Sequence, residues 1–186
     1  LAFYLATIWW VINTMTTYGR MPLALSLVAL GLLAGVLAGY TAAFAWLLAL
    51  GRERLGLPEG VLPVVAAALW TALEFLRTYL FSGFPWALLG YTQYRQPTVR
   101  LLAAATGVYG VSALVLLVNV AVAGMLAAAL RRHGGPARWR GLVPPIALVA
   151  LVAVGTIAYG WGFGRDVADG PAFQVGVRQG NIDQSG

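Results

Sequence analysis

The chain has 186 residues, of which 60% are hydrophobic and only 10% are charged, and its formal net charge is +6. Because soluble domains carry about a quarter of their residues as charges, this composition excludes an ordinary soluble protein and predicts a membrane protein. All twelve basic residues are arginine, scattered along the chain, and there is no cysteine and one histidine, so nucleic-acid binding, a disulfide framework, a metal site and a cofactor are not expected.

Five apolar segments are predicted to cross the membrane as helices, since a span requires about 20 predominantly apolar residues. They lie at about residues 1–17, 22–50, 61–81, 99–130 and 142–163. The turns at 51–60 and 131–141 are the most compactly basic, which favours the cytoplasm as their side. The predicted fold is therefore an all-α polytopic membrane helix bundle over residues 1–164, with about five spans.

Glycines in two of these segments predict close contacts or bends. Gly31, Gly35 and Gly39 recur at a spacing of four, which places them on one stripe of a helix and predicts a packing face. Gly107 and Gly110 indicate either close packing or a kink in the fourth segment.

The third segment carries two charges inside an apolar stretch, in the sequence LEFLRTYLFSGFPW. Glu or Arg at the centre of a span costs about 2.5–3.5 kcal/mol each, so Glu74 and Arg77 require compensation. Residues three apart share a helix face, so the two side chains are expected to form an ion pair. Trp70 lies on the same face and is placed to donate its indole N–H to Glu74.

A break in the helix is predicted directly after this pair. Pro85 lacks an N–H and Gly83 permits backbone angles that other residues avoid, so the chain is expected to leave helical geometry at 82–85. Arg77, one turn earlier, is placed to bind carbonyl groups that the break frees. Two interpretations of the ion pair stay open: it holds the broken helix together, or it lines a pocket for a lipid headgroup.

The end of the chain differs in character from the apolar segments. A linker rich in Gly, Asp and Pro is followed by alternating apolar and polar residues over 173–178, the period of a strand with one buried face. A single strand needs partners for its backbone groups. Residues 165–186 are therefore predicted to be the linker and first β-strand of an incomplete second domain.

Residues 68–94, ALWTALEFLRTYLFSGFPWALLGYTQY, resemble the bacterial apolipoprotein N-acyltransferases, which have a Trp, then Glu-x-x-Arg, Gly-Phe-Pro-Trp and Gly-Tyr-x-Gln. Residues 107–119 and 175–184 are similar to two further family blocks, the second being the first strand of a nitrilase-like domain. The resemblance implies eight substrate-binding, lipid-binding or structural residues, namely Trp70, Glu74, Arg77, Phe84, Pro85, Trp86, Tyr91 and Gln93. Belt aromatics at the membrane interface are the plain alternative for Trp86, Tyr91 and Tyr94.

The family is known to transfer a fatty acyl chain from a phospholipid to the N-terminal diacylglyceryl-cysteine of lipoproteins, through a Cys thioester on an extracytoplasmic α-β-β-α nitrilase-like domain. Its catalytic triad is Glu, Lys and Cys. This chain has neither Lys nor Cys, so the triad is expected to follow Gly186, and no catalytic residue is expected within the chain. The resemblance implies a multi-pass protein of the bacterial cytoplasmic (inner) membrane with its C-terminal end outside.

A secondary transporter is the alternative, because a broken span with intramembrane charges is also a transporter feature. That alternative predicts inverted repeats and a second broken helix, and neither is evident in the sequence. A non-catalytic membrane anchor is a third and less specific possibility.

Overall fold

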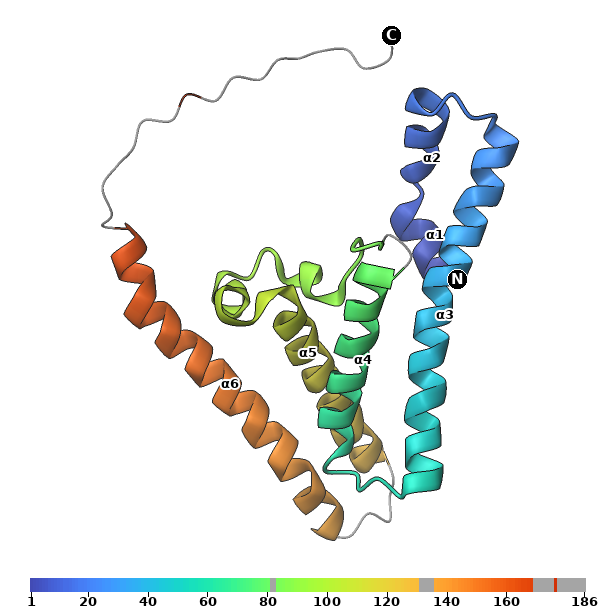
Figure 1. The fold of residues 1–186 in the computed structure, drawn as a ribbon. Coiled ribbons are helices and arrows are strands. Elements are labelled where there is room, and N and C mark those ends of the chain that lie inside the picture. The colour runs from blue at the N-terminus through green and yellow to red at the C-terminus, as the bar shows by residue number, and fades with distance from the viewer. Residues whose placement is uncertain (81–82, 131–135, 169–175, 177–186) are drawn as a thin grey trace. The chain divides into compact units, whose positions relative to one another are not determined.

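The structure is a computed structural model that describes residues 1–80, 83–130, 136–168 and 176 (Figure 1). Helices make up most of these residues, and none of them forms a strand. The chain divides into two compact units, of which one contains residues 1–42 and the other residues 43–168. The strand predicted at 173–178 falls, apart from Gly176, outside the described residues.

The first unit begins with short helical pieces, where the sequence predicts a single helix over 1–17. These are α1 (Ala2–Ile8), α2 (Val11–Asn13) and the π-helical turn η1 (Thr14–Tyr18). A turn at residues 9–10 separates α1 from α2. The prediction of a single helix over this stretch is therefore wrong. An apolar run indicates that a segment lies in apolar surroundings, whereas the positions of bends depend on local hydrogen bonding.

The long helix α3 (Leu23–Leu55) belongs to both units. It starts directly after Pro22, and its last turn carries Arg52 and Arg54, whose charges complement the negative end of the helix dipole. Within the first unit, the Tyr4 hydroxyl of α1 lies 3.0 Å from the Thr41 hydroxyl of α3. This hydrogen bond ties the beginning of the chain to the long helix.

The glycine stripe of α3 does not form the packing face that its spacing predicts. A Cβ built on Gly31, Gly35 or Gly39 would meet no atom within 4 Å. All three positions are outside the buried set of α3, which contains Ser26, Leu30, Ala34 and Leu37. Among the described residues, therefore, no backbone approaches this stripe.

The second unit contains α4 (Leu62–Tyr79), the 3₁₀-helix η3 (Leu89–Gln93), α5 (Pro97–Leu130) and α6 (Pro136–Ala168). Figure 1 shows α4 and α5 side by side. Prolines at or next to the first helical position start α4, α5 and α6, where a missing N–H costs nothing. The helix α6 continues to Ala168, beyond the predicted end of the bundle at 164.

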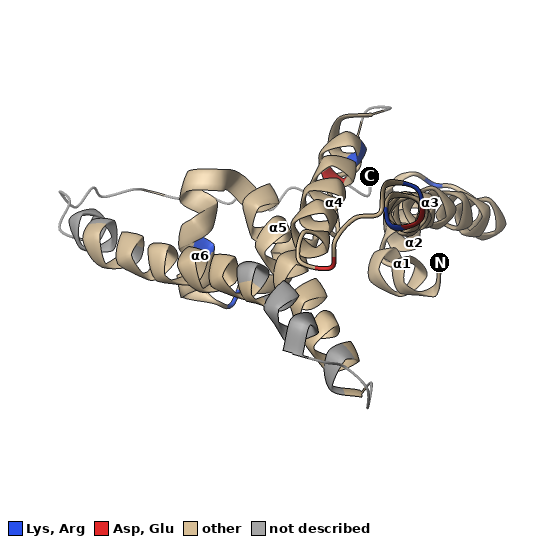
Figure 2. Ribbon diagram, turned by 90° about the horizontal axis from the view of Figure 1, so that it is seen from below, with Lys and Arg blue, Asp and Glu red and all other residues tan. Residues whose placement is uncertain are grey.

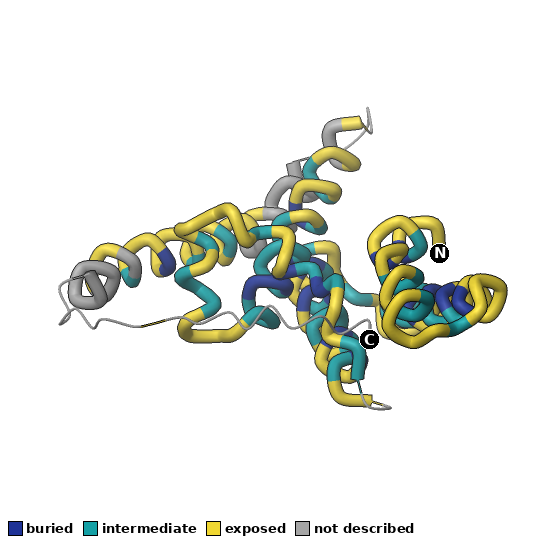
Figure 3. Tube along the Cα trace, turned by 90° about the horizontal axis from the view of Figure 1, so that it is seen from above, coloured by how far each residue is buried: buried dark blue, intermediate teal, exposed yellow. Residues whose placement is uncertain are grey.

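The core of the second unit lies between α4 and α5 (Figure 3). Small residues on α4, Ala66 and Ala67, are buried, as are Val111, Leu117 and Ala121 on α5. Small side chains let two helix backbones come close, which membrane helices use in place of a hydrophobic driving force. Between α4, α5 and α6 lies an apolar crevice of about 350 Å³, to which α5 contributes residues such as Leu102.

The helix α5 is bent at Gly107, where φ is 67° and ψ is −173°. These angles belong to a backbone region that is essentially restricted to glycine. Figure 1 shows the first turns of α5 nearly end-on and the remainder lengthwise beside α4. Of the close packing and the kink that the sequence allows for Gly107, the structure has the kink, because a Cβ there would meet nothing within 4 Å.

Two described helices are long and apolar enough to cross a membrane. They are α3 and the part of α5 from Pro97 to Ala127, each with a mean hydropathy of 2.2 in its most apolar window. A shorter apolar stretch, Ile146–Tyr159, lies in α6. Charged positions are sparse on the ribbon (Figure 2). The predicted all-α membrane character is confirmed at this level, and the number of spans stays a prediction.

Replacing Gly107 by alanine is expected to destabilise the protein by about 1–3 kcal/mol, because alanine would be held in the glycine-only region. The matched control is Gly155→Ala in α6, where a Cβ also meets nothing within 4 Å but the backbone is helical. Alanine is the better helix former there, so the control is expected to be neutral or slightly stabilising. Thermal unfolding in detergent measures both, and equal melting temperatures for the two variants would contradict this account of the bend.

Candidate functional site: a non-helical loop held between two helices

The chain leaves helical geometry after Tyr79, as the Gly and Pro of the sequence predict. Leu80 is extended, with φ −76° and ψ 138°. The Gly83 amide then donates to the Leu80 carbonyl at 2.9 Å, and the Phe84 amide donates to the Arg77 carbonyl at 3.0 Å. Gly83 has a φ of 77°, and a Cβ there would overlap the carbonyl group of Thr78. Glycine is therefore required where the chain folds back against the end of α4.

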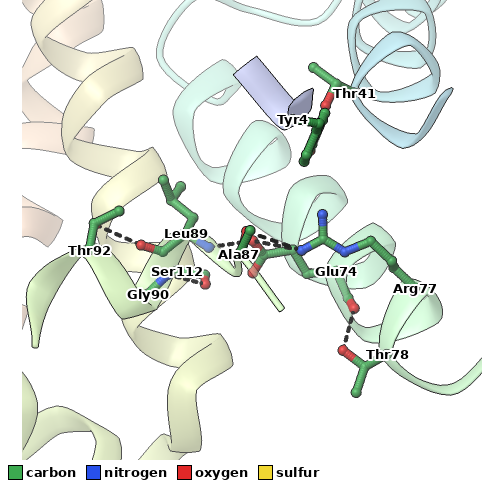
Figure 4. A network of polar contacts seen from close by, with 10 residues as sticks. All are labelled: Tyr4, Thr41, Glu74, Arg77, Thr78, Ala87, Leu89, Gly90, Thr92 and Ser112. Atoms are coloured by element: carbon green, nitrogen blue, oxygen red, sulfur yellow. Dashed lines mark hydrogen bonds and ion pairs between the residues drawn. The ribbon is translucent and has the colours of Figure 1, made fainter. Parts of the chain in front are cut away.

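Glu74 reaches the returning chain with its carboxylate. Its Oε1 accepts a hydrogen bond from the backbone N–H of Leu89 at 2.7 Å (Figure 4). The residue is 2% exposed, so this bond is made away from solvent. A hydrogen bond to an ionised acceptor is stronger than a neutral one, and here it fixes a residue 15 positions further along the chain.

Arg77 holds the same loop through a carbonyl group. Its Nη2 donates to the Ala87 carbonyl at 3.3 Å and lies 4.0 Å from Oε1 of Glu74. Arg77 is 4% exposed, so guanidinium and carboxylate are buried together. The predicted ion pair and the predicted bond to a carbonyl of the break are both present. Ala87 has a φ of 58°, an unfavourable conformation for a residue with a Cβ, and the bond to its carbonyl helps to hold it there.

Ser112 supplies a second support from the opposite helix. Its hydroxyl oxygen, on α5, accepts the N–H of Gly90 at 2.8 Å. Ser112 is completely buried, and a Cβ on Gly90 would lie 2.5 Å from the Val108 carbonyl oxygen. Two successive amides, those of Leu89 and Gly90, are thus bound by side chains of two different helices. Sequence reasoning missed Ser112, and the signal available was a serine within an apolar helix.

The sequence-based expectation for Trp70 is wrong in one respect. Its indole N–H is buried and has no hydrogen-bond partner among the described residues, so the predicted bond to Glu74 is not formed. The Trp70 ring instead packs edge-to-face against Phe44, with 5.1 Å between the ring centroids. The same buried part of α4 contains the Thr71 hydroxyl and Oε2 of Glu74, which also lack partners in the described part of the chain.

The remaining predicted site residues lie on the outward side of the loop. Pro85, Trp86 and Tyr91 are exposed, with Trp86 at 54% and Tyr91 at 50%. Phe84 and Gln93 are partly exposed, and the Gln93 amide donates to the Thr92 hydroxyl at 3.1 Å. The loop therefore turns bound backbone groups toward the helices and presents aromatic side chains away from them.

The polar groups of this site hold the loop in place, and the loop exposes aromatic side chains. Glu74 and Arg77 each make one hydrogen bond to the loop backbone, which supports the interpretation that the pair holds the broken helix together. In the described part of the chain, no three His, Asp or Glu residues are grouped so as to hold a metal ion. The arrangement positions a rigid aromatic loop, and the sequence offers no nucleophilic Cys or catalytic Lys beside it.

Replacing Ser112 by alanine is expected to cost about 1–3 kcal/mol of stability, since the buried Gly90 amide would lose its acceptor. Ser26→Ala is the matched control, because Ser26 is equally buried but its hydroxyl donates to the Pro22 carbonyl, which already accepts the Ser26 amide. The control is expected to change the stability by less than about 0.5 kcal/mol. Denaturant titrations in mild detergent compare the two, and a loss as large in the control would remove the special role of Ser112.

Comparisons with known proteins place the chain in a family. A family model described as the apolipoprotein N-acyltransferase N-terminal domain matches residues 1–121. The chain is 37% identical to the apolipoprotein N-acyltransferase of Geobacter metallireducens, over 100% of this chain and 34% of that protein. It is 33% identical to the protein of the same name from Pasteurella multocida, over 100% of this chain and 34% of that protein.

A third relative, the apolipoprotein N-acyltransferase of Vibrio parahaemolyticus, is 31% identical over 95% of this chain and 32% of that protein. The chain thus spans about a third of the length of the curated relatives it matches. No solved structure gives a significant match. Since the family model covers more than half of the 186 residues, the chain belongs to the apolipoprotein N-acyltransferase N-terminal domain family.

Proposed function

We propose that the chain is the membrane half of an apolipoprotein N-acyltransferase, which transfers a fatty acyl chain from a phospholipid to the N-terminal diacylglyceryl-cysteine of a lipoprotein. The observation that carries this proposal is the family match together with relatives of that name along the whole chain. The chain itself has no Cys and no Lys, so the thioester chemistry is assigned to a nitrilase-like domain that follows it. Residues 165–186 are proposed to be the linker and first strand of that domain.

Both proposed substrates favour a membrane platform, because their acyl chains prefer the bilayer. Each CH₂ group is worth about 0.8 kcal/mol in hydrocarbon, so extraction of a whole chain into water would be prohibitive. We assign the platform to residues 83–93, where Glu74, Arg77 and Ser112 fix the backbone and the aromatic side chains project outward. In this proposal Phe84, Pro85, Trp86, Tyr91 and Gln93 form the surface that lipid substrates meet.

One observation favours the alternative function, a transporter. The bend of α5 at Gly107 is a second interruption of an apolar helix. The family membership nevertheless favours acyl transfer, because the relatives are named for that reaction.

The function is tested in the full-length protein with a phospholipid donor and a synthetic diacylglyceryl lipopeptide acceptor. Acylation of the lipopeptide amine, detected by mass spectrometry, is expected from the wild type. Trp86→Ala is expected to slow transfer on the order of tenfold, because the substrate would lose a positioning contact. Trp161→Ala, which removes an 80% exposed tryptophan from α6, is the control and is expected to leave the rate unchanged. If the folded wild type left the lipopeptide unacylated, the proposed function would be refuted. Equal transfer rates for Trp86→Ala and Trp161→Ala would refute only the role of Trp86.

We propose that the protein lies in the bacterial cytoplasmic membrane as a multi-pass protein, with about five spans in this chain and its C-terminal end outside. The compact arginine clusters in the turns at 51–60 and 131–141 support this orientation. Alkaline phosphatase fused after Gly186 is expected to be active, and the same enzyme fused after Gly56 is expected to be inactive. The reverse pattern of activities would invert the topology.

A further inference from the structure

The first turns of α5 are not needed to cross a membrane. The 23 residues from 108 to 130 follow the bend at Gly107. At 1.5 Å per residue they extend about 34 Å, which already exceeds the hydrocarbon thickness of about 30 Å. Residues 97–106 point in a different direction from this part of the helix (Figure 1). The helix α5 therefore consists of a short segment, residues 97–106, and after it a segment long enough to span the membrane.

This short segment lines the bundle with a leucine and exposes two polar side chains. Leu102 lines the apolar crevice between α4, α5 and α6, and Val99 and Leu101 are partly covered. Thr98 and Arg100 are exposed. A short segment that places a leucine against the bundle and exposes a guanidinium group suits the boundary between headgroups and acyl chains.

The stretch leading into the segment is basic and aromatic. Tyr91 is 50% exposed and Tyr94 is 61% exposed, and the Arg95 guanidinium lies 5.3 Å from the centre of the Tyr94 ring. Tyrosine is enriched at membrane interfaces because its ring is apolar and its hydroxyl is polar. Arg95 is exposed, like Arg100, so both guanidinium groups can reach ligands outside the protein.

The positive charge of this surface is not neutralised by the protein. No acidic residue occurs between Glu74 and Asp166 in the sequence. Among the residues that the structure describes, no carboxylate forms an ion pair with Arg95 or Arg100. The turn at 51–60 is different, since its two arginines are accompanied by two glutamates and its formal charge is zero. The turn at 51–60 and residues 95–100 each contain two arginines, but their formal charges are zero and +2.

We propose that residues 91–106 form an interfacial surface that binds the phosphate groups of anionic phospholipids through Arg95 and Arg100. A guanidinium group matches phosphate oxygens with two parallel N–H donors. The tyrosines place their rings at the level of the headgroups, and Leu102 anchors the segment to the bundle. Tyr91 belongs to both surfaces, but Arg95 and Arg100 lie outside the substrate platform of residues 83–93, and the lipid that they bind undergoes no reaction.

Lipid retention tests the proposal on the full-length protein in detergent. Binding of phosphatidylglycerol and of phosphatidylcholine is titrated by native mass spectrometry. For Arg95→Gln combined with Arg100→Gln, we expect phosphatidylglycerol to bind on the order of tenfold more weakly. The charge-matched control, Arg52→Gln combined with Arg54→Gln, is expected to change binding less than about twofold, because it alters a turn of zero net charge.

The conservative double variant Arg95→Lys and Arg100→Lys is expected to retain most of the binding, which separates loss of charge from loss of folding. Inorganic phosphate at millimolar concentration is expected not to displace the lipid, since the acyl chains contribute to binding. Equal weakening in the glutamine pair and the control pair, or no weakening in either, would overturn the proposal. Displacement by inorganic phosphate would overturn the lipid as the ligand.

The depth of the segment provides a second measurement that does not depend on affinity. The chain contains no Cys, so Thr98→Cys and Val122→Cys give unique spin-label positions in it, with any cysteine elsewhere in the full-length protein replaced by serine. In lipid nanodiscs, a label at residue 98 is expected to collide with a water-soluble nickel complex and a label at residue 122 with oxygen. Oxygen accessibility of residue 98 equal to that of residue 122 would place the segment in the hydrocarbon and refute an interfacial position.

Discussion

The second unit depends on one constraint, that backbone groups leaving a helix among apolar surroundings must find partners within the protein. Residues 83–93 meet it with side-chain bonds in addition to turns and the short 3₁₀-helix η3. Glu74 accepts one amide, Ser112 accepts the next, and Arg77 donates to a carbonyl. These three contacts join α4, the loop and α5, so the backbone of the loop is fixed to both helices.

This constraint also explains why charged residues are kept inside an apolar helix. A buried ion pair seldom stabilises a protein through mutual attraction alone, because desolvation offsets the Coulomb energy. Here the 4.0 Å between Arg77 and Glu74 is long for a strong ion pair, whereas the carboxylate accepts the Leu89 amide at 2.7 Å. The backbone bonds therefore account for the two charges better than the pair itself. Each charge lies beside the other, while one polar atom of each side chain binds the loop.

The sequence predicts the features of this site that depend on residues close together in the chain. The cost of two charges in an apolar span predicts a pair, and Gly83 with Pro85 predicts the break, because both arguments involve residues within a few turns of each other. Ser112 escapes prediction because a serine or threonine in an apolar helix often bonds its own preceding turn, as Ser26 and Thr156 do. Its long-range role depends on how α5 packs. The same limit applies to the glycine stripe of α3, since spacing reveals a smooth face but not a neighbour.

The position of Ser112 relative to the bend in α5 has a mechanical consequence. Gly90 is attached to α5 at Ser112 and touches Val108, both beyond Gly107 in the chain. The aromatic loop is thereby fastened to the spanning part of α5, whereas the helical turns before Gly107 line the crevice with Leu102. Gly107 separates those turns from the part of α5 that carries the loop. None of the three bonds that hold the loop involves residues 97–106, so the geometry of the loop does not depend on the direction of those turns.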